Sequence, residues 1–176
     1  MKHESNYEEL ISAAGQLKRT KRSGWVKKAG IKNAESVADH CFRMALIGAC
    51  VSEDVGLDSE KVMRMCLIHD LAESVIGDLM PEEKTSEKSH RDCEDVVMRG
   101  ILGRLPRKAA RKLLRDWNEL RAGRTREARA VWQIDRLEMG LQMKEYSTVS
   151  KSKALDQFDP SAKLMPYFRK MLDEYS

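Results

Sequence analysis

Apolar residues recur at intervals of three and four along most of the chain, which is the period of an amphipathic α-helix. No segment alternates apolar and polar residues in the way that a half-buried strand does. The apolar stripes comprise Leu10, Ile11, Ala14 and Leu17, then Val37, Met44, Ile47 and Val51, then Val62, Met65, Ala72 and Ile76, then Val96, Val97, Ile101 and Leu102, and finally Val131, Ile134, Leu137, Met139 and Leu141. The pattern predicts an all-α bundle of six to seven helices.

Residue types that begin and end helices mark the boundaries of these segments. Ser36 followed by Asp39 has the spacing of a capping box that opens the second helix. The third helix is expected to begin at Asp58 or Ser59 and to continue without a break until Gly77 ends it. Later boundaries are indicated by Pro106, Gly123, Thr125, Pro160 and Pro166.

Length and composition favour a compact protein with no membrane segment. A chain of 176 residues suits one domain, since domains commonly contain roughly 100–200 residues. No apolar run reaches the ~18 residues that a membrane span requires, and the first residues lack the apolar stretch of a signal peptide. We therefore expect a single domain over residues 1–176 in the cytoplasm. The four cysteines form no CxxC pair and are expected to be reduced thiols.

The charge of the chain is mildly positive, at +4, and the basic residues gather in two segments. One segment spans residues 18–28 and the other spans residues 104–129. Such runs attract a phosphorylated small molecule or nucleic acid, but a solvated helix surface has the same composition. Charge alone therefore leaves the partner open.

Three polar side chains interrupt the apolar stripes. His40, His69 and Asp135 each lie three or four residues from apolar positions on both sides. A lone inward histidine is more often a satisfied core residue than a ligand. Three helices that each direct such a group inward are harder to explain in that way, because a buried charge without a partner costs several kcal/mol. One metal ion at their meeting point would satisfy all three side chains.

The adjacent pair His69-Asp70 extends this candidate ligand set. Neighbouring residues on a helix diverge by ~100°, and two fairly long side chains can still converge on one ion. Two imidazoles and two carboxylates suit manganese, cobalt, zinc, iron or magnesium, and four ligands leave positions for water and substrate. Glu73 follows His69 by four residues and is expected one turn along the same helix face. There it could activate or orient water or protonate a leaving oxygen; an exposed glutamate on the helix rim is the alternative.

Five short motifs give the chain a resemblance to a known family. They are LKRTKRSGWV at residues 17–26, AESVADH at 34–40, IHDLAE at 68–73, GDL at 77–79 and QIDRLEM at 133–139. In this order they resemble the HD-domain phosphohydrolases, and more narrowly the branch that contains the 5′-deoxynucleotidases. The resemblance covers a core of about residues 7–146 and leaves a helical tail at 147–176.

The resemblance implies an HD-type bundle with one divalent metal ion on His40, His69, Asp70 and Asp135, and with Glu73 assisting catalysis. It implies hydrolysis of a deoxyribonucleoside 5′-monophosphate, a small-molecule substrate, in a homodimer. The residues that it places around the substrate are Arg22 and Trp25, which face the nucleotide, Asp78, which borders the sugar or phosphate, and Glu119, a pocket residue. The base preference is not carried over, because residues 117–119 replace a more acidic, aromatic-containing stretch found in many relatives.

Physical chemistry is consistent with these implied roles. Arg22 or Lys18 could hold the phosphate charge, and a guanidinium group does so through two parallel hydrogen bonds. Trp25 could pack on the sugar and leave no room for a 2′-hydroxyl, although a core aromatic after a turn would look the same in the sequence.

Other readings of the sequence remain open. Guanosine tetraphosphate hydrolases of the HD superfamily usually have an acidic residue after the glutamate that corresponds to Glu73, where this chain has Ser74. Cyclic-nucleotide phosphodiesterases and di-iron relatives need further histidines, and only His3 and His90 remain, in no matching motif. A helical module that binds nucleic acid would be expected to interleave aromatic residues with its basic ones, and aromatics are only 6% here. A scaffold without activity would not need all five site residues, Glu73 included.

Overall fold

The computed structural model describes residues 6–175, and in this range the secondary structure is helical, with one isolated bridge between Lys21 and Ser36 instead of strands. The all-α fold predicted from the sequence is confirmed. The helices are α1 (Glu8–Leu17), α2 (Ser23–Lys27), α3 (Val37–Val55), α4 (Ser59–Ile68), α5 (Glu73–Ile76), α6 (Glu87–Leu102), α7 (Arg107–Ala122), α8 (Arg126–Val149) and α9 (Pro166–Glu174). Short 3₁₀ helices cover Pro81–Glu83, Lys153–Phe158 and Ser161–Lys163.

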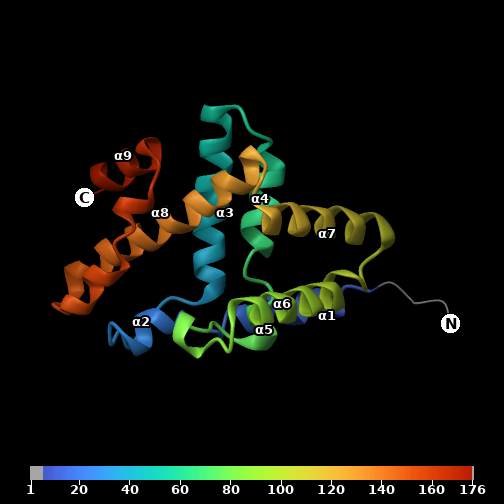
Figure 1. Cartoon of the computed structure of the whole chain (residues 1–176), viewed down its shortest axis with the longest axis horizontal. Coiled ribbons are helices and arrows are strands. Elements are labelled where there is room, and N and C mark those ends of the chain that lie inside the picture. The colour runs from blue at the N-terminus through green and yellow to red at the C-terminus, as the bar shows by residue number, and fades with distance from the viewer. Residues whose placement is uncertain (1–5, 176) are drawn as a thin grey trace.

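Three helices, α3, α4 and α8, form the centre of the fold. α3 and α4 pack side by side as a hairpin, and α8 crosses both of them (Figure 1). Gly48 allows this close approach, because a Cβ there would lie 3.0 Å from Val62 and 3.3 Å from the Cys66 sulfur. α7 packs against α4 and α8, while α1 packs against α5 and α6. The central three helices are also the ones that carry the predicted metal ligands.

The core between these helices is made by the apolar stripes that the sequence shows. Val37, Met44, Val62, Met65 and Ile134 are completely buried. Each side chain of this kind contributes roughly 1.5–3 kcal/mol when it is fully removed from water. A smaller second cluster gathers around Trp25, Ala29, Ala34, Tyr146 and Leu155.

The start of α3 is fixed by the predicted capping box. The Ser36 hydroxyl accepts a hydrogen bond from the Asp39 amide, and the Asp39 carboxylate accepts one from the Ser36 amide at 2.8 Å. Gly56 ends the helix with a φ of 65°, a left-handed conformation that glycine adopts without a steric penalty. Since His40 lies in the first turn, this cap also sets the position of the first candidate ligand.

The third predicted helix is broken, which corrects the sequence analysis. α4 ends at Ile68, residues 69–72 form turns, and the separate short helix α5 begins at Glu73. The break has a local cause. The His69 imidazole lies 2.8 Å from the Cys66 carbonyl oxygen, the group that the Asp70 amide would bond in a continuing α-helix. The following amides bond three residues back instead, as in Leu71 to Ile68 and Glu73 to Asp70.

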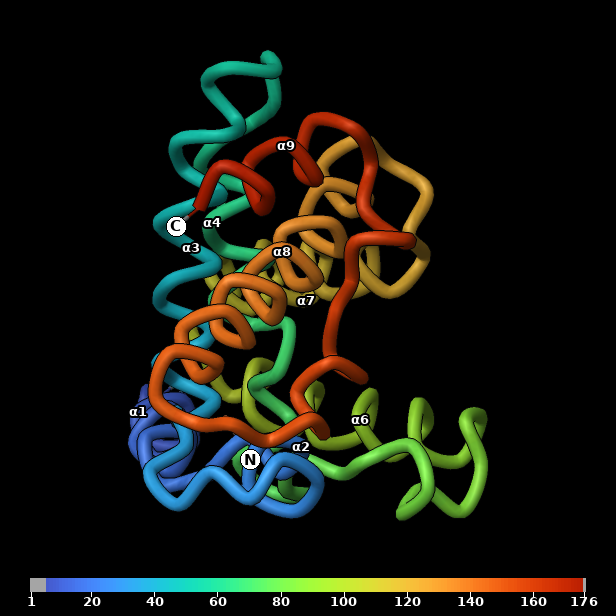
Figure 2. The backbone as a smooth tube through the Cα atoms, turned by 90° about the vertical axis from the view of Figure 1, so that its left-hand side faces the viewer, coloured from blue at the N-terminus to red at the C-terminus, as the bar shows by residue number. Residues whose placement is uncertain are grey.

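The seven helices of nine or more residues in the described part of the chain correspond to those predicted, while α2 and α5 are additional short helices beside the candidate site. After α8 the chain turns back along that helix and passes close to α2 before it reaches α9 (Figure 2). Phe158 in this returning segment packs on Trp25 of α2, with ring centroids 4.3 Å apart. The segment beyond residue 146 therefore contributes to the same region as the predicted core. No described helix is long and apolar enough to span a bilayer.

Candidate metal centre and adjoining pocket

The four predicted ligands come together from three central helices. His40 lies in the first turn of α3, His69 and Asp70 follow the end of α4, and Asp135 lies in the middle of α8. The His40 Nε2 atom is 3.3 Å from the Asp135 carboxylate and 3.9 Å from the Asp70 carboxylate. The His69 Nε2 atom is 2.9 Å from the same Asp70 oxygen. Four groups that are up to 95 residues apart in the sequence thus surround one point.

The two imidazoles are oriented with their Nε2 atoms toward this point. The Nδ1–H group of His40 donates to the Glu138 carboxylate, and that of His69 donates to the Cys66 carbonyl oxygen at 2.8 Å. Because both acceptors lack a proton to give, each Nδ1 carries a hydrogen, and the neutral form of each ring therefore has its lone pair on Nε2. Both Nε2 atoms are buried and have no hydrogen-bond partner among the described residues. Two such nitrogens facing two carboxylates fit a divalent cation.

The charges of the cluster favour a positive charge at its centre. Burial would raise the pKa of Asp70, but His69 and Arg22 lower it below its ordinary value. Burial would likewise raise the pKa of Asp135, but His40 lowers it. For His69, burial lowers the pKa and Asp70 raises it, with a net shift well above the ordinary value. The two carboxylates are therefore ionised, as metal ligands must be.

Glu73 reaches the cluster from the first residue of α5, after the break in the third predicted helix. Its amide donates to the Asp70 carbonyl oxygen at 3.0 Å, which holds the two residues in one turn. One oxygen of its carboxyl group is buried without a hydrogen-bond partner in the described part of the chain. Burial raises the pKa of Glu73 well above its usual value, and the carboxylates of Asp70 and Asp78 raise it further. This carboxyl group is therefore suited to carry a proton beside the ligands.

Arg22 connects the cluster to a cavity. The residue directly precedes α2, and its guanidinium group lies 3.3 Å from the Asp70 carboxylate. Burial would lower the pKa of Arg22, but Asp70, Asp78 and Asp135 raise it above its ordinary value. The guanidinium group is thus a fixed positive charge that faces both the candidate ligands and the cavity.

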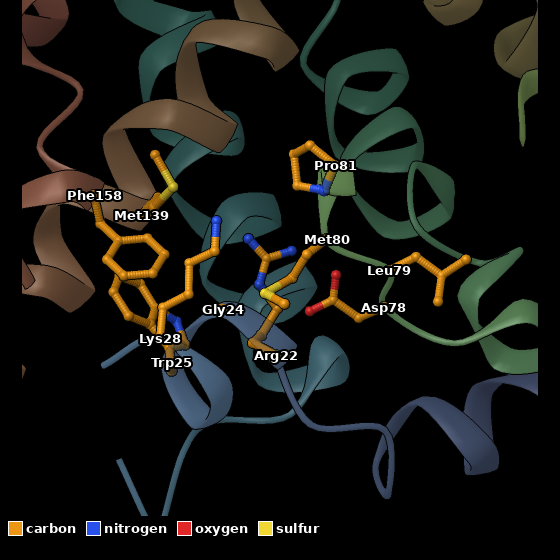
Figure 3. A pocket seen from close by; sticks show the side chains of 10 residues that line it. All are labelled: Arg22, Gly24, Trp25, Lys28, Asp78, Leu79, Met80, Pro81, Met139 and Phe158. Atoms are coloured by element: carbon orange, nitrogen blue, oxygen red, sulfur yellow. The ribbon is translucent and has the colours of Figure 1, made fainter. Parts of the chain in front are cut away.

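The cavity has a volume of about 140 Å³ and lies between α2, the loop after α5, and the segment that returns along α8. Figure 3 shows Arg22 and Asp78 facing each other on one side, and Met139 and Phe158 on the other. The complete lining is Arg22, Gly24, Trp25, Lys28, Asp78, Leu79, Met80, Pro81, Met139 and Phe158. It combines two cationic side chains, one carboxylate and an apolar wall, so both charged and apolar parts of a ligand could be accommodated.

Besides Arg22, two more of the predicted substrate residues, Asp78 and Trp25, line this cavity and are held in place by further contacts. Asp78 accepts a hydrogen bond from the Ser23 amide, which fixes its carboxylate against the start of α2. Trp25 is only 2% exposed, and its indole N–H donates to the Glu35 carboxylate at 2.9 Å. The sequence predicts that the indole packs on the sugar; in the structure it is an almost fully buried part of the cavity wall.

The remaining two predicted substrate residues, Lys18 and Glu119, lie outside this cavity, so a part for them in substrate binding stays a prediction. Lys18 is exposed directly after α1 and is not part of the cavity lining. Glu119 on α7 pairs with Lys61 at 2.6 Å, near the start of α4. His69 follows the other end of that helix, and eight residues of helix separate the two positions by about 12 Å. The spacing of Glu119 on its own helix gave no information about which helix it would face.

Several residues at the site were missed by the sequence analysis. Glu138 is completely buried against His40, and its position three residues after Asp135 was a readable sign that both share one face of α8. Glu35 bonds Trp25, and burial, reinforced by Glu138, raises the pKa of Glu35 to about 7. Lys28 and Phe158 reach the cavity only through tertiary packing, so the sequence carried no sign of their role.

The chain is similar in sequence and in fold to several known proteins. The sequence model of the HD domain family matches residues 14–167. A protein named 5′-deoxynucleotidase HDDC2 from Dictyostelium discoideum is 34% identical over 171 residues, covering 93% of this chain and 87% of that protein. The protein of the same name from Mus musculus is 35% identical over 155 residues, covering 87% of this chain and 77% of that protein. A solved structure, a conserved hypothetical protein from Pyrococcus furiosus, superposes with a TM-score of 0.77 at 32% identity and covers 96% of this chain and 98% of that one.

Proposed function

The chain belongs to the HD domain family, and we propose that it is a metal-dependent 5′-deoxynucleotidase, which hydrolyses deoxyribonucleoside 5′-monophosphates to deoxynucleosides and inorganic phosphate. The observation that carries the proposal is the pair of buried, unpartnered imidazole nitrogens that face two ionised carboxylates. The curated relatives named 5′-deoxynucleotidase, which match most of the chain, support the choice of substrate class.

His40, His69, Asp70 and Asp135 would hold the divalent metal ion. The mixed nitrogen and oxygen set suits manganese, cobalt, zinc, iron or magnesium, and the lack of a thiolate among the four disfavours a closed structural zinc site. When bound, such an ion supplies a Lewis acid that neutralises phosphoryl charge and lowers the pKa of water. The remaining chemistry falls to side chains of the protein.

Arg22 would bind the phosphate group. Its guanidinium group is a permanent cation that already faces the cluster and lines the cavity, so it can offer two parallel N–H donors to phosphoryl oxygens. Lys28 adds a second cation to the lining, and its ammonium group lies 2.9 Å from the Glu82 carboxylate. These two charges favour entry of a dianionic monophosphate over that of an uncharged nucleoside.

Glu73 would move the proton that the reaction needs. As water bonds to phosphorus and the bond from phosphorus to the 5′ oxygen breaks, the proton on Glu73 passes to the 5′ oxygen. A proton from the attacking water then restores the carboxyl group, so atoms and charges balance. The raised pKa of Glu73 supports this role, since a neutral carboxyl group can donate where an ionised one cannot.

Asp78 and the apolar wall would hold the nucleoside. Asp78 has its carboxylate fixed by α2, and an oxygen of that group can accept a hydrogen bond from a sugar hydroxyl. Met139, Phe158 and the edge of Trp25 form an apolar surface on the other side of the cavity, against which the sugar and base can pack. A ribonucleotide would have to bury its additional 2′-hydroxyl there without a partner, at a cost of about 1–3 kcal/mol.

The test is phosphate release from a panel of deoxyribonucleoside and ribonucleoside 5′-monophosphates by metal-free protein to which single metal ions are returned. We expect release only with metal and faster release from the deoxy series. Release that is independent of metal, or absent from every monophosphate, would refute the proposal. The homodimer and the cytoplasmic location expected from the resemblance stay predictions, and sedimentation of the purified chain tests the first.

A further inference from the structure

The imidazole of His40 is held between two carboxylates of the same helix. Asp135 and Glu138 lie one turn apart on α8, and they face opposite nitrogens of the ring. Asp135 lies 3.3 Å from Nε2, whereas Glu138 accepts the hydrogen bond from Nδ1–H. His40 and Glu138 are both completely buried, so water cannot replace this contact.

The Glu138 carboxylate is itself held from its other side. Its second oxygen accepts a hydrogen bond from the Arg43 Nε–H group at 2.8 Å. The same guanidinium group donates to Gln142 at 2.6 Å and to Glu145 at 2.7 Å. Arg43 lies one turn after His40 on α3, so these hydrogen bonds form a row between α3 and α8 that begins at His40.

These contacts leave Glu138 no free oxygen to serve as a ligand. One oxygen bonds the His40 ring and the other bonds Arg43. The carboxylate also lies on the Nδ1 side of the ring, away from the unpartnered Nε2 atom that faces Asp70 and Asp135. Its effect on a metal ion must therefore pass through the imidazole.

We propose that Glu138, held by Arg43, is a positioning residue that fixes the orientation and tautomer of His40 for metal binding. The inference rests on the proposed metal centre and adds a residue to which that proposal gives no role. A carboxylate on Nδ1–H keeps the proton on that nitrogen, leaves the Nε2 lone pair directed at the ion, and increases the basicity of the ligand. Loss of such an outer partner typically weakens metal affinity by 10–100-fold.

The experiment measures metal binding by metal-free protein without substrate, using Co²⁺ alone as the probe. The Glu138→Gln variant keeps the shape of the side chain and removes its charge. We expect its dissociation constant for Co²⁺, followed by visible absorption, to rise ~10–100-fold. We also expect the Co²⁺ concentration for half-maximal turnover to rise while turnover at saturating Co²⁺ recovers, a response that a loss of folded protein would not produce.

Asp116→Asn is the matched control. Asp116 is also completely buried and also pairs with an arginine, Arg64, at 2.7 Å, but it joins α7 to α4 and touches none of the candidate ligands. The control should lose stability in a thermal melt and keep the wild-type affinity for Co²⁺. Equal loss of affinity in both variants, or an unchanged affinity in Glu138→Gln, would overturn the proposal.

A second variant covers the case in which Glu138→Gln does not fold. Arg43→Lys removes the planar fork that holds the carboxylate but keeps both the charge and Glu138 itself. The proposal expects weaker Co²⁺ binding in this variant too, by a smaller factor, and an unchanged affinity would overturn it. Because binding is measured without nucleotide, a wild-type protein that binds Co²⁺ but hydrolyses no deoxynucleotide would refute the proposed function and leave this inference standing.

Discussion

Replacement of Glu73 by glutamine is the sharpest test of the proposed chemistry. Glutamine keeps the shape of the side chain and removes the proton that the carboxyl group would carry. One oxygen of Glu73 is buried without a partner, and the neighbouring carboxylates of Asp70 and Asp78 oppose its ionisation. The substitution therefore breaks no described ion pair, and we expect the folded protein and its metal content to persist.

The expected loss of turnover follows from the role assigned to this residue. General acid–base assistance contributes typically about 10²–10⁴-fold. Since each factor of ten is about 1.36 kcal/mol, the barrier should rise by roughly 2.7–5.4 kcal/mol. The assay is turnover of dAMP by the metal-saturated variant, with metal content measured on the same sample. Glu60→Gln, which changes an exposed glutamate on α4, is the control and should retain wild-type turnover.

A second substrate separates the two ways in which Glu73 could act. The leaving group of p-nitrophenyl phosphate is stable without a proton, so it needs no general acid. If Glu73 protonates the leaving 5′ oxygen, the defect of Glu73→Gln should shrink strongly with this substrate. If it activates water instead, the defect should persist. Turnover of dAMP that is unchanged in the variant would refute both roles, and loss of the metal would make Glu73 a ligand.

Three further substitutions test the site. Asp135→Ala should remove a metal ligand, so that bound metal and phosphate release fall together while circular dichroism still shows a helical fold; a variant with full metal content would exclude Asp135 from the site. Trp25→Phe should lose the hydrogen bond to Glu35 and lower the ratio of kcat/KM for dAMP to kcat/KM for AMP. An unchanged ratio would show that other residues determine the sugar selectivity. Gly24→Ala would place a Cβ 2.9 Å from the Phe158 ring. We therefore expect a raised KM for dAMP and a loss of about 1–3 kcal/mol in the free energy of unfolding, measured in urea. Wild-type values of both quantities would show that Phe158 moves aside without a cost.

Sequence periodicity was sufficient to predict the fold class and the long helices. Apolar spacing and capping residues act over a few residues, so signals such as the Ser36–Asp39 box can be read without knowledge of the rest of the chain. The same periodicity made His40, His69 and Asp135 visible as polar groups on apolar stripes, and the structure brings them together. A buried polar side chain needs a partner wherever it lies, so its presence on an inward face carries information about its environment.

Tertiary packing decided the rest of the site. At the break after Ile68, the His69 ring bonds the Cys66 carbonyl oxygen of its own helix, a contact that the apolar spacing does not reveal. Glu119 could not be placed from the sequence either. Helical spacing shows which face of α7 it lies on but not which helix packs on that face, and in the structure its partner is Lys61 of α4. Phe158 reaches the cavity because the chain folds back along α8. Contacts between residues far apart in sequence form only when whole helices dock, and local pattern contains no record of which surfaces will meet.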